Sequence, residues 1–233
     1  MGTPSKTRTA TATRGRPRGS ISAGTEAPDR KRDILLAAER LFAEHGFHGV
    51  AIRDIANEAG VQFALVGYYY GPKLDLYQEI FRQRSGYIQE RLNSLARAQA
   101  GAPRDQLLEE IVKAFVLPVL KMARDPDGRN FLRLIQRGMD EQLKEDEPMI
   151  RTMFDPLALA FIDAFAAAIP GATPGTAACC YQFAFGAMLH HISDKRIERL
   201  SRGEFPPISP EAAPLLVKFI TSGMRGMFAD AVH

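Results

Sequence analysis

The spacing of the apolar residues constrains the fold of this chain most strongly. From Asp29 onwards it follows the period of an amphipathic helix, and it almost nowhere alternates as in a strand. A first helix ending at Gly46 is followed by two short helices at about 51–59 and 62–69. Longer helical segments are predicted at about 72–98, 104–124, 127–142, 147–169, 174–202 and 210–230. We therefore predict an all-α protein of about nine helices, with kinks at Pro118 and Pro156.

Basic residues are concentrated at the N-terminal end of the chain. Residues 1–32 hold eight basic and two acidic side chains, whereas the other 201 residues hold 22 basic and 25 acidic ones. Residues 1–27 are rich in Thr, Gly, Pro, Ala and Arg and are predicted to form a disordered basic arm. Its "RGRPRG" stretch places Arg14, Arg16 and Arg18 on an extended backbone, which suits the narrow minor groove of A·T-rich DNA. The alternative is a disordered tail that only aids solubility.

Several classes of protein are disfavoured by motifs that the sequence lacks. It has no HExxH, no GxSxG, no phosphate-binding loop and no paired carboxylates in an apolar setting, so we do not expect an enzyme. The only cysteines, Cys179 and Cys180, are adjacent and lack metal-ligand spacing, so we predict neither a metal site nor a cofactor. No apolar run reaches the ~18 residues of a membrane helix, and the N-terminus has no apolar signal region. We therefore expect a cytoplasmic protein without a membrane partner.

The two short helices are joined by the tight turn "EAGV", which is typical of a helix-turn-helix. The second helix of such a motif enters the major groove of DNA. It carries three consecutive tyrosines, Tyr68 to Tyr70, which point in different directions and cannot all be buried. We expect some of them to face DNA, where their hydroxyls donate to phosphate oxygens, and others to pack on the first helix. Lys73 is expected to add a charge-assisted phosphate contact.

The stretch from Arg32 to Tyr77, "RDILLAAERLFAEHGFHGVAIRDIANEAGVQFALVGYYYGPKLDLY", resembles the DNA-binding domain of TetR-family transcriptional regulators. The matching motifs are AA-x-x-LF, G-[FY], I-x-x-IA-x-x-AGV and Y-x-[FY]-x-x-K-x-x-L. The resemblance implies a helix-turn-helix domain at 28–76 and a helical ligand-binding and dimerisation domain at 77–233. Val50 and Gly67 depart from the family pattern, in which Thr and Tyr are usual. The residues assigned to DNA contacts are Arg53, Gln62, Phe63, Leu65, Tyr68, Tyr69 and Lys73, with Arg14, Arg16 and Arg18 of the arm.

The C-terminal two-thirds resembles, more loosely, the ligand domains of TetR regulators that sense fatty acyl compounds. This resemblance implies an effector pocket among the middle helices and a dimer formed by the last two helices. The pocket residues are predicted to be Phe115, Leu134, Phe154, Phe161, Phe165 and Met188, and the alternative is that they are simply core. The dimer contacts are predicted to be Phe183, Gly186, Phe219, Gly223, Gly226 and Met227. The large residues among them supply apolar surface, and the glycines allow helices to approach closely.

The sequence therefore predicts a homodimeric, ligand-responsive regulator of transcription. It is expected to act as a repressor on double-stranded DNA with a palindromic operator and to be released by a small apolar or acyl-type effector. The alternative is a helical interaction module that has lost specific DNA binding. Val50, Gly67 and the apolar pair Phe63 and Leu65 favour that alternative.

Overall fold

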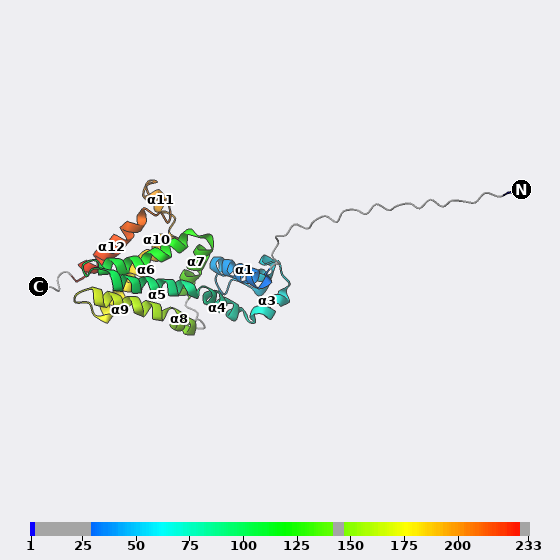
Figure 1. The fold of residues 1–233 in the computed structure, drawn as a ribbon, viewed down its shortest axis with the longest axis horizontal. Coiled ribbons are helices and arrows are strands. Elements are labelled where there is room, and N and C mark those ends of the chain that lie inside the picture. Colours follow the sequence, from blue (N-terminus) through cyan, green and yellow to red (C-terminus); the bar gives the residue numbers. More distant parts are fainter. Residues whose placement is uncertain (3–28, 142–146, 229–233) are drawn as a thin grey trace.

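A computed structural model describes residues 1–2, 29–141 and 147–228 of the chain. Within these ranges the structure contains twelve helices and no strand, so the predicted all-α class is confirmed. In Figure 1, α1, α3 and α4 lie together on the right of the helical part, beside a larger bundle that contains α5, α6, α9 and α12. We call the first part the head and the larger bundle the body.

The head begins with three helices, α1 (Arg30–His45), α2 (Ile52–Glu58) and α3 (Phe63–Tyr70). The side chain of Asp29 starts α1 by accepting a hydrogen bond from the backbone N–H of Arg32 at 3.1 Å. Gly46 ends α1 with a φ of 75°, in the left-handed region that favours glycine. Both signals can be read in the sequence, and the predicted order of three head helices is observed.

After α3 the chain contains more helices than the sequence predicts, because three long segments are each divided in two. The breaks lie at Arg84, at Phe154 and between Ser193 and Ile197. Pro156 does not kink a helix, because it lies in the first turn of α9, where no backbone donor is needed. The helices are α4 (Lys73–Gln83), α5 (Ser85–Gly101), α6 (Leu107–Arg124), α7 (Pro126–Glu141), α8 (Glu147–Met153), α9 (Asp155–Ala168), α10 (Pro174–Ser193), α11 (Ile197–Leu200) and α12 (Ala212–Gly226).

Two clusters of buried apolar side chains hold the described structure together. One cluster fills the body and includes residues of α5, α6, α9, α10 and α12. The other cluster fills the head, and it also takes in side chains of α4 and α7, among them Phe81 and Phe131. A Cβ atom added at Gly138 of α7 would lie 3.2 Å from the hydroxyl of Tyr77, so α7 packs closely against α4. The head is therefore fixed to the body by a shared apolar core.

Candidate functional site

The turn between α2 and α3 brings two short helices together against α1. The backbone N–H of Val61 donates to the carbonyl of Ala56 at 2.9 Å, and Gly60 allows the turn with a φ of 63°. Ile55 and Ala56 of α2 and Val66 of α3 are buried in the head core. One face of each helix is thereby fixed, and the opposite face of α3 is left exposed, as a helix that enters a DNA groove requires.

The three tyrosines of α3 separate into inward and outward roles. The Tyr70 hydroxyl donates to the Lys31 carbonyl at 2.7 Å, which joins α3 to α1. Tyr68 is 81% exposed, and the rings of Tyr68 and Tyr69 meet edge to face with their centroids 5.2 Å apart. Burial raises the pKa of Tyr70 to about 12, so this hydroxyl stays a donor at neutral pH. Tyr70 is thus structural, whereas Tyr68 faces outward from the head.

The exposed face of α3 also presents Gln62, Phe63 and Gly67. The guanidinium of Arg53 from α2 lies 5.9 Å from the centroid of the Phe63 ring, so the two helices contribute to one surface. A Cβ atom added at Gly67 would meet no atom within 4 Å, which leaves room for a close approach from outside. Leu65, by contrast, is half-buried against the head core, so the structure does not place it on this surface.

Lys73 has a different environment from the one the sequence suggests. Its ammonium donates to the carbonyls of Phe47 and Val50 at 2.8 and 3.0 Å, and it lies 4.3 Å from the centroid of the Phe47 ring. These acceptors belong to the loop between α1 and α2. Two of the three ammonium protons are therefore used inside the head, where they hold this loop against the start of α4.

The start of α2 lacks a side-chain acceptor. Ala51 is the N-cap residue, and its own backbone N–H donates to the Asp54 carboxylate at 2.8 Å. Val50, which replaces the Thr usual in the resembled family, is buried in the head core. Val50 therefore contributes an apolar contact where a Thr would present a hydroxyl. The Asp54 carboxylate accepts the hydrogen bond of one backbone N–H group at the start of α2.

The head alone carries little positive charge for a polyanion. Residues 29–76 contain six basic and seven acidic side chains. The exposed pair of Arg40 and Glu58, 3.0 Å apart, neutralises one of these cations locally. The described head therefore has no net positive charge. Arg14, Arg16 and Arg18 of the predicted arm lie outside the described residues.

The predicted effector residues fall into two groups. Phe115, Phe161, Phe165 and Met188 are all buried in the body core, with the ring centroids of Phe115 and Phe161 5.0 Å apart. Leu134 belongs to the head cluster instead, and Phe154 packs on that cluster with its ring 5.9 Å from Phe81. The structure therefore brings four of the six residues together, because the break before α9 directs Phe154 towards the head.

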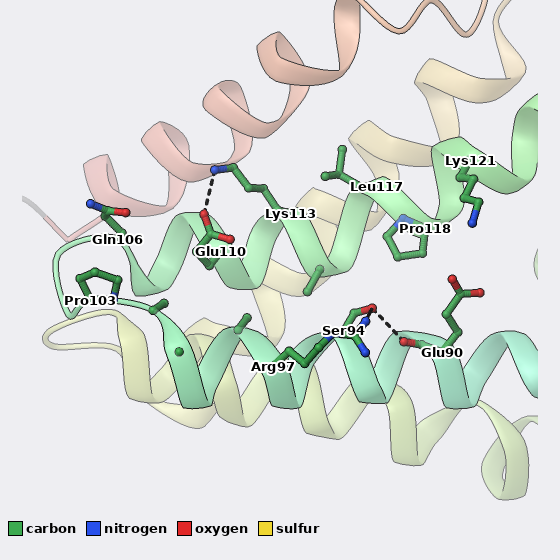
Figure 2. Close-up of a pocket in the computed structure, with 14 residues that line it drawn as sticks. Glu90, Ser94, Arg97, Pro103, Gln106, Glu110, Lys113, Leu117, Pro118 and Lys121 are labelled. Atoms are coloured by element: carbon green, nitrogen blue, oxygen red, sulfur yellow. Dashed lines mark hydrogen bonds and ion pairs between the residues drawn. The ribbon is translucent and has the colours of Figure 1, made fainter.

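Among the grooves on the described surface are four with volumes of about 540, 760, 390 and 100 Å³. None of the six predicted effector residues lines any of them. Figure 2 shows the groove of about 540 Å³ between α5 and α6, with Glu110 paired to Lys113 and the Ser94 hydroxyl bonded to the Glu90 carbonyl. Of its other charged side chains, Arg97 donates to the Ser94 hydroxyl at 2.9 Å.

Arg91 is a residue that the sequence does not single out, although it lies inside the body core. It is 3% exposed, and its Nη2 donates to the Phe115 carbonyl at 3.1 Å. The sequence signal is a charge on an apolar helix face, four residues after Tyr87 and four before Leu95. Such a residue usually lies at the surface with its stem along apolar neighbours, so the pattern alone does not indicate burial.

An apolar face on α10 and α12 has no partner in the single chain. Phe183 is 63% exposed, Phe219 is 70% exposed and Met227 is 51% exposed. Cβ atoms added at Gly186, Gly223 and Gly226 would each meet no atom within 4 Å. All six residues predicted to form the dimer contact are therefore accessible on these two helices. We call this surface the α10/α12 face.

The described residues show no cluster of metal ligands and no membrane-spanning helix. Among them, no three His, Cys, Asp or Glu side chains gather as a metal ion would need. No helix in the described ranges combines the length and the apolar composition that crossing a bilayer demands. Cys180 is buried and Cys179 is exposed on the outer side of α10, so the adjacent cysteines point apart.

Comparison with known proteins supports the resemblance over both parts of the chain. A family model described as "Bacterial regulatory proteins, tetR family" matches residues 34–80. A second model, "Tetracyclin repressor-like, C-terminal domain", matches residues 113–223. Together they cover more than half of the chain.

Curated relatives match mainly over part of their length. The HTH-type transcriptional regulator BetI of Agrobacterium fabrum is 28% identical over 130 residues, which cover 50% of this chain and 62% of the relative. The HTH-type transcriptional repressor BepR of Brucella suis biovar 1 is 33% identical over 92 residues, 40% of this chain and 44% of the relative. In both alignments the chain spans less than two thirds of the relative.

Solved structures match over most of the chain at low identity. A TetR-like transcriptional regulator from Rhodococcus sp. RHA1 is 22% identical, with 87% of this chain and 100% of that chain covered at a TM-score of 0.57. The fatty acid degradation regulator FadR from Bacillus halodurans is 17% identical, with 86% and 97% covered at a TM-score of 0.56. These two likenesses show the fold.

Proposed function

Because this chain belongs to the TetR family of bacterial transcriptional regulators, we propose that it represses transcription as a homodimer and is released from a palindromic operator by a small effector. It is a DNA-binding regulator with a helix-turn-helix, and it is not an enzyme. The observation that supports this proposal most directly is the exposed face of α3. On it, Tyr68 points outward and Phe63 lies beside Arg53. On this surface the Tyr68 hydroxyl suits a phosphate, and the Phe63 ring suits a thymine methyl group.

A dimer through the α10/α12 face supports recognition of a palindrome. Two heads related by a two-fold axis would reach successive major grooves, roughly 34–36 Å apart. The exposed rings of Phe183 and Phe219 supply apolar area, and the glycines beside them allow the helices to approach closely. Repression is favoured by relatives that are named as repressors, such as BepR of Brucella suis biovar 1. Action on DNA would place the protein in the cytoplasm.

The body is the proposed site of the effector. Phe115, Phe161, Phe165 and Met188 lie together in its core and suit an apolar or acyl-type molecule. The fold likeness to a regulator named for fatty acid degradation is in keeping with such a molecule. By linkage, an effector that weakens DNA binding must itself bind less tightly to the DNA complex, by the same factor.

The test begins with selection of a binding site from a random pool of double-stranded DNA. We expect a palindromic site, bound with a log affinity that falls steeply as log salt rises. Tyr68→Phe should weaken binding to selected and random DNA by a similar factor, whereas Phe63→Ala should reduce the preference for the selected site. Lys121→Gln, on the exposed surface of α6, is the control and should change neither. If no site is enriched and binding does not depend on salt, the protein is instead an interaction module.

A further inference from the structure

Two charged side chains are buried in the described part of the chain, and only one of them has a counter-ion. Glu39 is 4% exposed and accepts hydrogen bonds from the guanidinium of Arg84, the shortest at 2.7 Å. Arg91 is 3% exposed, and no carboxylate of the described residues lies within 4.0 Å of its guanidinium. Transfer of a charge from water into a protein core is costly unless that charge is paired. The burial of Arg91 without a counter-ion therefore needs an explanation, whereas the burial of Glu39 is explained by its pairing with Arg84.

The surroundings of Arg91 are aromatic. Its guanidinium carbon lies 4.8 Å from the ring centroid of Phe115, 5.2 Å from that of Phe161 and 5.5 Å from that of Tyr87. The faces of these rings attract a cation but do not accept all of its N–H groups. The Nη2 group donates to the Phe115 carbonyl, whereas Nε is buried without a hydrogen-bond partner in the described structure. An acceptor is thus lacking on at least one edge of the guanidinium.

Two tyrosine rings belong to the same cluster: the Tyr87 ring centroid lies 5.5 Å from the guanidinium carbon of Arg91, and the Tyr181 ring centroid lies 5.4 Å from that of Phe115. Burial raises the pKa of Tyr87, and the charge of Arg91 together with a hydrogen bond between the two side chains partly offsets this effect. Burial likewise raises the pKa of Tyr181, again with a smaller lowering by Arg91. Both hydroxyls therefore remain protonated at neutral pH and can donate hydrogen bonds. A guanidinium flanked by two hydroxyl donors is a good environment for an anion.

We propose that Arg91 binds the carboxylate of a monoanionic effector whose apolar part lies among the aromatic side chains of the body core. The proposal rests on the proposed function, in which the body holds an effector, and it names the chemical class of that molecule. A monoanion is favoured because one guanidinium compensates one charge, whereas a phosphate dianion would leave net negative charge in an apolar core. Phe161 and Phe165 come from α9, so an apolar chain entering here would lie between α5, α6 and α9.

Binding at Arg91 requires the core to open. Arg91 lines none of these four grooves of the described surface, and the rings of Phe115 and Phe161 beside it lie 5.0 Å apart, so an apolar chain placed between them would have to separate them. The α5 helix that carries Arg91 begins directly after Arg84, the partner of Glu39 in α1. Arg84 and Arg91 are seven residues apart, about two helical turns. A displacement of α5 at Arg91 would therefore be transmitted to the head.

The test compares acids with alcohols of equal chain length on the full-length protein. Octanoate, decanoate and dodecanoate are titrated beside octanol, decanol and dodecanol, with affinity measured by calorimetry. We expect at least one acid to bind about tenfold or more tightly than its alcohol. Arg91→Met should abolish this preference, and Arg91→Lys should retain part of it, because the charge stays while the planar fork is lost. Arg97→Met, an exposed position on the same helix, is the matched control and should keep the preference.

A purely structural role of Arg91 makes the opposite predictions. If Arg91 only braces the rings, Arg91→Met should lower the unfolding temperature and leave the acid-to-alcohol ratio unchanged. If Arg91 instead binds an anion, the Arg91→Met protein without ligand should unfold at the same or a higher temperature than the wild type, because an unpaired buried charge has been removed. Should Arg91→Met fail to fold, the ratio for Arg91→Lys decides. Absence of any acid preference in the wild type overturns the proposal.

The same titrations are repeated with the selected DNA bound, which separates this inference from the proposed function. Acids and alcohols that bind equally and both release DNA would leave the ligand-responsive regulator intact and overturn only the assignment of Arg91. An acid preference that depends on Arg91 but never changes DNA affinity would support the carboxylate site and contradict the ligand response.

Discussion

Arg84, at the break between α4 and α5, donates from its Nη2 to both carboxylate oxygens of Glu39 in α1, at 2.7 and 3.0 Å. Its Nε adds a third hydrogen bond of 3.2 Å to the same carboxylate. The guanidinium also lies 5.7 Å from the ring centroid of Phe131 in α7. A second polar contact involves Arg137 of α7, which donates to the carbonyl of Glu44 near the end of α1, at 2.7 Å. Polar contacts thus join the head to the body across the apolar core that the two parts share.

The first prediction concerns the pairing of Glu39 with Arg84. Arg84→Met should reduce the free energy of unfolding by about 3 kcal/mol, because it leaves the Glu39 carboxylate buried without a partner. Glu39→Gln should cost less, since the side chain of Arg84 is partly exposed and can reach water. The double change Glu39→Met with Arg84→Met should recover most of the loss. Urea unfolding at fixed protein concentration measures all three.

A matched control for this pair is the exposed pair of Arg40 and Glu58. Arg40→Met should change the free energy of unfolding by less than about 1 kcal/mol, because exposed ion pairs contribute little. If Arg40→Met and Arg84→Met have equal effects, the burial of Glu39 has no energetic consequence.

The second prediction concerns pH. Burial raises the pKa of Glu39, and the hydrogen bond and charge of Arg84 offset this only in part. The folded protein therefore holds this proton more tightly than the unfolded chain does. The stability that Glu39 contributes is present below its unfolded pKa and is lost as pH rises through the raised pKa. The difference in unfolding free energy, wild type minus Glu39→Gln, should accordingly shrink from about pH 4 to about pH 7. An increase over this range would show that Arg84 outweighs burial.

The third prediction concerns Lys73, whose ammonium is bonded to two loop carbonyls. Lys73→Met should reduce the free energy of unfolding by about 2 kcal/mol, because hydrogen bonds to a charged group are removed and two carbonyls are left without their donor. Tyr68→Phe, on the exposed face of α3, should leave stability unchanged and weaken only DNA binding. If Lys73→Met keeps full stability and lowers the salt slope of DNA binding by ~0.9, Lys73 binds a phosphate after all.

Features of the fold that depend on residues close in sequence are the ones that the sequence predicts. The helical period, the end of α1 at Gly46 and the turn at Gly60 are predictable, because each depends on residues within a few positions. The break at Arg84 is not, since it coincides with a contact to Glu39 that lies 45 residues away. Tertiary contacts of this kind leave no periodic trace in the sequence.

The candidate site follows the same division. The family motif singles out Lys73, but the carbonyls that accept its hydrogen bonds belong to residues 23 and 26 positions earlier. Leu65 lies on a helix face whose exposure is decided by how α3 packs on α2, and it is half-buried. Arg91 is charged, and its burial depends on rings from α6 and α9 that no spacing rule connects to α5.

The fourth prediction concerns the α10/α12 face. A side chain at Gly223 meets no atom of its own chain within 4 Å, so Gly223→Leu should not strain the protomer. The same change should prevent close approach of a second copy and convert the dimer into a monomer. Operator affinity should then fall by about tenfold or more, because the two heads no longer bind as one unit. Gly86→Leu, on α5, also meets no atom and is the control. Light scattering that gives a dimer for Gly223→Leu would place the interface elsewhere.

The last prediction concerns the arm, which carries Lys6, Arg8, Arg14, Arg16 and Arg18. Because residues 29–76 contain more acidic than basic side chains, deletion of 1–27 should weaken DNA binding strongly. The salt slope should become shallower by up to ~0.9 for each phosphate that a subunit no longer neutralises. A flexible chain of ~27 residues would have a reach of roughly 25–30 Å, which is enough to follow the groove beside a bound head. Changing Arg14, Arg16 and Arg18 to Gln, with the length kept, separates charge from chain length. If "RGRPRG" lies in the minor groove, this triple change should cost more affinity on operators with A·T-rich flanks than with G·C-rich ones. An equal loss on both flanks would indicate a general electrostatic arm, and no loss on either would leave a tail that only aids solubility.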